Sequence, residues 1–158
     1  MGDEKKELLG ELAKQFDRAK KELGFKASFE DLDNAFFITD SVLSAGFVSE
    51  TYSRQLCARI VDNFMNWNHY LNSLLMPNPS FLVNAIEAKL FNTEENRKKI
   101  WELVKGSMKM TSTNYLLGLT KDKKKEAAFI DEAVKYWNSS FKQGLTEIVG
   151  KISEEWGK

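Results

Sequence analysis

The stretch "DKKKEAAFIDEAVKYWNSSFKQGLTEIVGKISEEWG", residues 122–157, decides the fold of this chain. Its large apolar residues fall on one side of a helix, at Ile130, Val134, Trp137, Phe141, Leu145, Ile148, Ile152 and Trp156. The pattern repeats every eleven residues, which keeps a seam in line along a nearly straight helix. We therefore predict one long amphipathic helix over residues 122–157, with its apolar side turned toward a core.

The same helical period runs through the rest of the chain. Two more long helices are predicted, over residues 49–76, where the prolines at 77 and 79 follow, and over residues 94–119, after the capping pattern "NTEE". Shorter helices are expected to end before Gly24, and to cover residues 28–46 and about 78–91. No alternation typical of strands is present. The prediction is an all-α protein: an antiparallel bundle of about six helices, three of them long, in a single domain of residues 1–158.

Composition excludes several classes of protein. Apolar residues make up 42% of the 158 residues and charged residues 29%, as in ordinary globular domains. A single cysteine cannot form an internal disulfide, and no apolar run reaches the roughly 18 to 20 residues that a membrane span needs. The N-terminal "MGDEKKELLGELAK" carries charges where a signal peptide would be apolar, so a cytoplasmic protein is expected.

The charge is unevenly distributed along the chain. The net charge is zero, but residues 97–125 carry 9 basic and 2 acidic side chains, whereas residues 1–50 carry 7 basic and 11 acidic ones. Three lysines share one face of the helix predicted over residues 94–119, and four more follow in the next turn. These seven residues form the predicted anion-binding surface: Lys98, Lys105, Lys109, Lys121, Lys123, Lys124 and Lys125.

Two of the predicted helices are apolar on more than one side. In the helix over residues 28–46, Phe37 and Ile38 point away from the main apolar side. In the helix over residues 94–119, one stripe holds Val104, Met108, Thr111 and Tyr115, and another stripe about 140° away holds Leu103, Met110 and Leu117. This surplus of apolar surface predicts self-association or a protein partner, through a candidate interface of Phe37, Ile38, Leu103, Met110 and Leu117. The four tryptophans are expected to be buried.

The sequence provides no established catalytic pattern. The only histidine, His69, lies opposite the apolar side of its helix, and Cys57 lies near the buried side. The asparagines around His69 are interpreted as a polar exterior. No phosphate loop, dinucleotide fingerprint or Glu-x-x-His pair is present, so we assign no catalytic, metal-binding or cofactor-binding residue.

Three hypotheses for function follow. The first is a non-enzymatic helical-bundle protein that acts through protein–protein contacts, as a homodimer or as a subunit of a larger assembly. The alternative is a nucleic-acid-binding accessory protein that contacts phosphates through the lysine surface. An enzyme is the third, and it requires carboxylates such as Asp33, Asp40 and Asp62 to converge in a cleft.

Overall fold

The computed structural model describes residues 2–158, which form helices and connecting loops without any strand. The helices are α1 (Gly2–Leu23), α2 (Phe29–Phe36), α3 (Ile38–Ala45), α4 (Tyr52–Leu75), α5 (Leu82–Lys89), α6 (Glu94–Thr120), α7 (Lys123–Tyr136) and α8 (Lys142–Trp156). A π-helical turn, η1 (Trp137–Phe141), joins α7 to α8 in one continuous helix. The predicted all-α bundle and its three long helices are confirmed. Counted with α7–η1–α8 as one, the described residues form seven helices, one more than expected.

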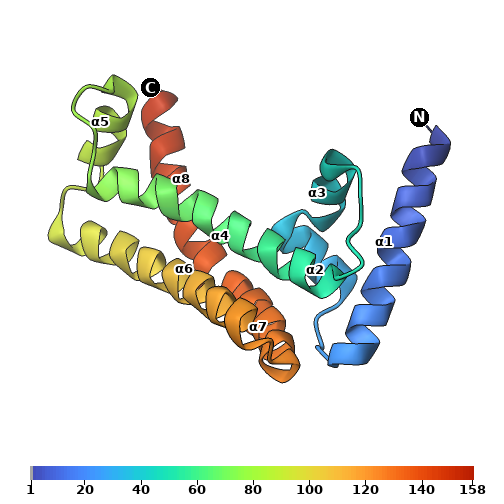
Figure 1. The fold of residues 1–158 in the computed structure, drawn as a ribbon. Coiled ribbons are helices and arrows are strands. Elements are labelled where there is room, and N and C mark those ends of the chain that lie inside the picture. Colours follow the sequence, from blue (N-terminus) through green and yellow to red (C-terminus); the bar gives the residue numbers. More distant parts are fainter. Residues whose placement is uncertain (1) are drawn as a thin grey trace.

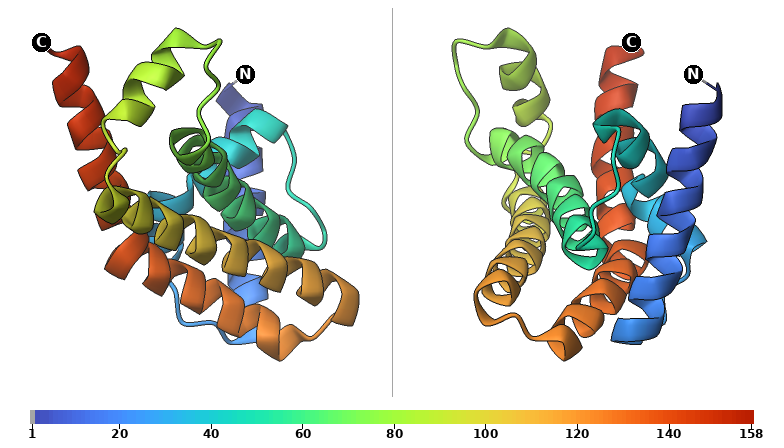
Figure 2. Two further views of the ribbon diagram at one scale, coloured as in Figure 1. Left: turned by 90° about the vertical axis from the view of Figure 1, so that its left-hand side faces the viewer. Right: turned by 45° about the vertical axis from the view of Figure 1, so that its right-hand side comes forward.

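The centre of the bundle is the antiparallel pair of α4 and α6, which lie side by side along their length (Figure 1). Helix α7 returns along α6, and α8 continues upward behind α4 toward the C-terminus. Helix α1 packs on the other side of the molecule, against α3, α4 and α7, and α5 lies beside α4 at the opposite end (Figures 1 and 2). As a result, α6 has one face covered by α4, α7 and α8 and another face open to solvent.

An aromatic cluster forms the centre of the core. Phe64 of α4 lies 5.6 Å from Phe36, 6.1 Å from Trp137 and 5.1 Å from Phe141, measured between ring centroids. The last two rings come from the ends of the π-helical turn, which inserts one extra residue into the helix. Of the apolar side predicted for residues 122–157, every residue is buried except Trp156. The hydrophobic pattern therefore predicted this helix and its buried side correctly.

The helix predicted over residues 28–46 is divided at Phe37. The backbone of Phe37 is left-handed, with φ of 55°, and its N–H donates to the carbonyl oxygen of Asp33 at the end of α2. The carboxylate of Asp33 then accepts from the backbone N–H of Thr39 at 2.7 Å and from its hydroxyl at 3.0 Å. Asp33 thus ends one helix and begins the next, and this local bonding overrides a pattern that reads as continuous.

The short helix before α6 begins later than predicted, at Leu82 rather than near Asn78. The backbone N–H of Asn78 donates to the side chain of Asn84 at 2.7 Å, and the amide of Asn84 donates to the carbonyl oxygen of Ser73 at 2.8 Å. Because Asn84 is buried and tied to the end of α4, residues 76–81 form a loop that these bonds hold in place.

Candidate functional site

Helix α6 carries two apolar stripes, and only one of them is covered. The buried side is held by α4 and α7 and consists of Ile100, Leu103, Val104, Ser107, Met110, Thr111, Asn114 and Leu117. The exposed side carries five large apolar side chains, and Leu116 lies about 60° around the helix from Trp101. The other four follow a spacing of seven, seven and four residues: Trp101, Met108, Tyr115 and Leu119. We name these four residues the α6 stripe. At about 100° per residue they lie within about 40° of one another, so they form one continuous line.

The orientation of the α6 stripe is set by the contacts on the opposite side of the helix. The amide of Asn68 on α4 donates to the carbonyl oxygen of Val104 at 3.3 Å and to the hydroxyl of Ser107 at 2.7 Å. On the α7 side, Gly106 leaves room for the ring of Tyr136 to pack directly on the α6 backbone. With both flanks held in this way, α6 cannot rotate to bury Trp101 and Met108 without losing these contacts.

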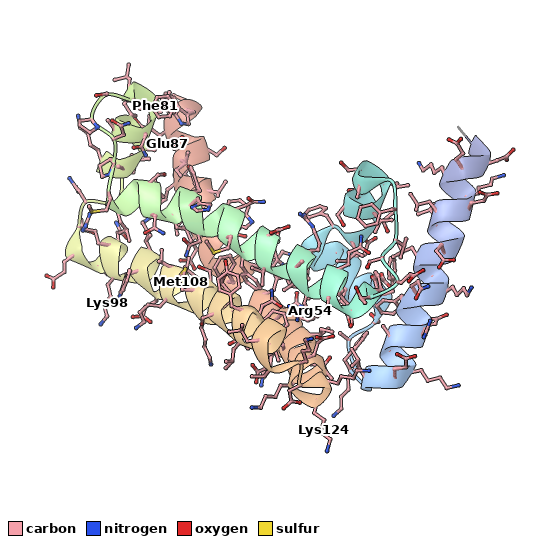
Figure 3. The ribbon with its side chains drawn as sticks, viewed as in Figure 1. Arg54, Phe81, Glu87, Lys98, Met108 and Lys124 are labelled. Atoms are coloured by element: carbon pink, nitrogen blue, oxygen red, sulfur yellow. The ribbon has the colours of Figure 1, made fainter. Side chains whose placement is uncertain are left out.

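Exposure is substantial along the whole stripe. Trp101 is 49% exposed, Met108 42%, Tyr115 64% and Leu119 83%. Single exposed apolar residues are ordinary, but four in a line on one helix are typical of a contact surface. Met108 lies midway along α6, and Lys98 lies near its N-terminal end (Figure 3).

A row of lysines runs beside the α6 stripe. Lys98, Lys105 and Lys109 are exposed and lie about 40 to 80° around the helix from Trp101. Lys105 pairs with Glu102 at 3.1 Å on the surface, whereas the other two have no carboxylate within 4.0 Å in residues 2–158. The open face of α6 therefore has an apolar edge, and beside it an edge that carries three lysines together with Glu102 and the exposed Leu116.

The second half of the predicted anion-binding surface lies at the far end of α6. Lys121, Lys123, Lys124 and Lys125 are all exposed in the α6–α7 turn and at the start of α7. The turn is shaped by Asp122, whose side chain accepts from the backbone N–H groups of Lys124 and Lys125. Only Lys121 and Lys123 line a cavity there. Of the seven lysines, three therefore lie along α6 and four at its C-terminal end, and two of these four face the cavity.

The residues predicted as an interface are mostly core residues. Leu103, Met110 and Leu117 are at most 9% exposed, because their side of α6 packs inside this chain. Ile38 of α3 is buried as well, and only Phe37 is on the surface. The sequence correctly indicated that α6 is apolar on two sides, but the open side is the one with Met108 and Tyr115. Trp101 was missed because tryptophan was expected in the core; of the four tryptophans only Trp137 is buried.

The residues considered for catalysis stay apart. Asp40, Asp62 and His69 are exposed, and no group of three or more metal-ligating side chains gathers within residues 2–158. Cys57 is fully buried, and burial raises the pKa of its thiol to about 12. A thiol that stays protonated at neutral pH is a poor nucleophile. The arrangement of these residues therefore offers no catalytic pair.

Not all of the asparagines around His69 belong to the exterior, contrary to the prediction. Asn63 and Asn68 are buried, and Asn68 bonds to α6 as described above.

None of the helices in residues 2–158 is both long and apolar enough to cross a bilayer. In comparisons with known proteins, no protein family, curated protein or solved structure matches this chain. Function must therefore be inferred from the surface of the molecule itself.

Proposed function

We propose that this helical bundle is a non-enzymatic binding protein whose α6 stripe docks an amphipathic helix of a partner protein. The observation that carries the proposal is the exposure of Trp101, Met108 and Tyr115 at seven-residue spacing on the open side of α6. This spacing keeps the side chains in line along about 21 Å of helix, which matches the apolar seam of a second helix.

The chemistry of the α6 stripe suits a protein partner. Tryptophan and tyrosine dominate the binding energy of protein interfaces, and methionine adapts its shape to an opposing surface. Burying one large apolar side chain contributes about 1.5 to 3 kcal/mol. Three or four such residues would contribute about 5 to 12 kcal/mol. Association itself costs about 4 to 15 kcal/mol, so a partner that is already helical and that pairs with the lysines is needed.

The charge beside the stripe indicates an acidic partner rather than a second copy of this chain. In an antiparallel pair of copies joined through the α6 stripe, Lys105 and Lys109 would lie close to the same residues of the other copy. Like charges across an interface oppose association, whereas aspartate or glutamate beside the seam of a partner helix would pair with Lys98, Lys105 and Lys109.

Nucleic acid is the second candidate, because Trp101 and Tyr115 are exposed aromatic side chains beside the lysine row. Bases stack on such rings, and lysines contact phosphates. Met108 and Leu119 between and beyond these rings offer no stacking surface, which is why we favour a protein partner. The two candidates differ in salt dependence, since phosphate contacts weaken steeply with added salt.

The test is a selection of amphipathic helical peptides from a displayed library on the intact protein. We expect enriched peptides to carry an apolar seam flanked by Asp or Glu, and to bind the variant Trp101→Ala/Met108→Ala/Tyr115→Ala at least ten times more weakly. The matched control is Phe47→Ala, which removes an exposed aromatic side chain elsewhere on the surface.

A library that yields no peptide dependent on the α6 stripe would contradict the proposal. Labelled single- and double-stranded oligonucleotides are titrated in parallel at two salt concentrations. Oligonucleotide binding that falls steeply with salt and is lost in Lys98→Gln/Lys105→Gln/Lys109→Gln would support the nucleic-acid hypothesis instead. Equal binding by that triple variant would reject the lysine row as the contact surface.

A further inference from the structure

A cavity of about 370 Å³ lies between α1, the N-terminal end of α4 and the α6–α7 turn. Four cationic side chains from different segments line it: Arg18, Arg54, Lys121 and Lys123. Its apolar wall includes Ala19, Leu23 and Leu117. The cavity is at the C-terminal end of α6, about 24 Å along the helix from Trp101, and it shares no residue with the α6 stripe.

The positive charge in this cavity is only partly balanced. Arg18 pairs with Glu22 at 2.9 Å, and Arg54 pairs with the buried Glu126 at 3.2 Å. Glu50 is the third carboxylate in the lining, against four cations. Lys121 and Lys123 have no carboxylate within 4.0 Å in the part of the chain that the structure describes. Lys121 and Lys123 therefore form no close ion pair, although Lys123 contributes, after Arg18, to lowering the pKa of the Glu22 carboxyl.

Arg54 is held in place before any ligand arrives, and the backbone of Lys121 is fixed by the end of α6. Arg54 reaches the carbonyl oxygen of Asn114 at 3.5 Å in addition to its bond with Glu126 (Figure 3 labels Arg54). Lys121 ends α6 in the left-handed conformation, with φ of 55°, a position where glycine is usual. A guanidinium that is already held, such as that of Arg54, binds an oxyanion at a smaller cost in side-chain entropy than a mobile one.

We propose that this cavity binds a small organic phosphate, with the phosphate group among Lys121, Lys123 and Arg54 and its carbon skeleton against Leu23 and Leu117. A phosphate oxygen accepts hydrogen bonds from ammonium and guanidinium groups, and these are the donors present. The N-terminal ends of α4 and α7 and the C-terminal ends of α1 and α6 all line the cavity, so the helix dipoles oppose one another and the charged side chains decide its potential. The proposal is independent of the α6 stripe, because it uses different residues.

The test is calorimetric titration of the intact protein with phenyl phosphate, with inorganic phosphate and phenol as the two halves of that probe. The cavity variant is Lys121→Gly/Lys123→Gln, which removes both charges while glycine retains the left-handed backbone at position 121. The matched control is Lys124→Gln/Lys125→Gln, which removes the same charge from the same turn outside the cavity. Melting temperatures of both variants no lower than that of the wild type show that the fold is retained; glycine at position 121 should raise the melting temperature slightly, because the backbone there has positive φ.

We expect phenyl phosphate to bind the wild type and the control variant equally, and the cavity variant at least ten times more weakly. Phenyl phosphate should also bind more tightly than inorganic phosphate or phenol. Absence of binding to the wild type at millimolar concentration would overturn the proposal. Equal loss in the cavity and control variants would also overturn it, because it would show that the anion senses only the net charge of the turn.

Discussion

Gly106 is the residue at which α7 packs directly on the backbone of α6. A side-chain carbon at this position would overlap the ring end of Tyr136, whereas a side-chain carbon at Gly150 on α8 would meet nothing within 4 Å. Tyr136 cannot withdraw freely, because its ring packs against Phe64 and Phe141 in the aromatic cluster. Gly106 is therefore needed for the close packing of α7 on α6, whereas no contact at position 150 requires a glycine.

We expect Gly106→Ala to lower the free energy of unfolding by about 1 to 3 kcal/mol, because the added methyl group overpacks the contact with Tyr136. Gly150→Ala should raise it by about 0.5 to 1 kcal/mol, since alanine costs less backbone entropy in a helix. Urea unfolding followed by circular dichroism measures both. A stabilising Gly106→Ala would show that Tyr136 moves aside without cost.

At the scale of elements, the division between α2 and α3 depends on a phenylalanine in a conformation that favours glycine. Phe37 is about half exposed, so its ring contributes little burial to offset the strained backbone. Asp33 accepts hydrogen bonds from the backbone N–H of Phe37 and from Thr39, and these bonds keep Phe37 in this conformation. The division between α2 and α3 therefore results from the hydrogen bonds around Phe37 and not from the conformational preference of phenylalanine.

We expect Phe37→Gly to raise the free energy of unfolding by up to about 1 kcal/mol, because glycine adopts positive φ without the clash of a Cβ atom. Phe37→Val should lower it, since a β-branched residue fits this backbone poorly. Thermal unfolding of the two variants beside the wild type tests the order. Destabilisation by glycine would instead show that the exposed ring makes a contact that matters.

At the scale of the whole molecule, Glu87 joins three helices at one end of the bundle. Its carboxylate on α5 accepts from the hydroxyl of Tyr70 on α4 at 2.9 Å and from the indole N–H of Trp156 on α8 at 2.9 Å (Figure 3 labels Glu87). Burial and the bond to Glu87 raise the pKa of Tyr70, so the phenol remains a donor at neutral pH. The carboxylate of Glu87 thus links α5 to the end of α8, although Glu87 and Trp156 are 69 residues apart in the sequence.

We expect Glu87→Ala to cost about 1.5 to 3 kcal/mol of stability, because it leaves two donors without their charged acceptor. Amide hydrogen exchange should accelerate in α5 and in the last turns of α8, with little change in α1. Trp156→Phe removes one of the two bonds and should produce a smaller effect in the same segments. Uniform acceleration across all helices would show that Glu87 acts on global stability alone.

The long helices were determined by the sequence itself. The predicted ranges of 49–76, 94–119 and 122–157 agree closely with Tyr52–Leu75, Glu94–Thr120 and the continuous Lys123–Trp156. Periodicity and capping are local properties, so they are visible without a structure. The buried stripe of residues 122–157 is unambiguous because that helix has a single strongly apolar side.

Only the tertiary structure decided which side of α6 is covered. Both of its stripes are apolar, and the difference arises because Asn68 bonds to Ser107 and Tyr136 packs on Gly106, contacts between residues distant in sequence. For the same reason, Lys121 and Lys123 meet Arg18 and Arg54 at one cavity although nothing in their local sequence separates them from Lys124. Helical period follows from neighbouring residues, whereas the open surface of a helix follows from what packs against its other side.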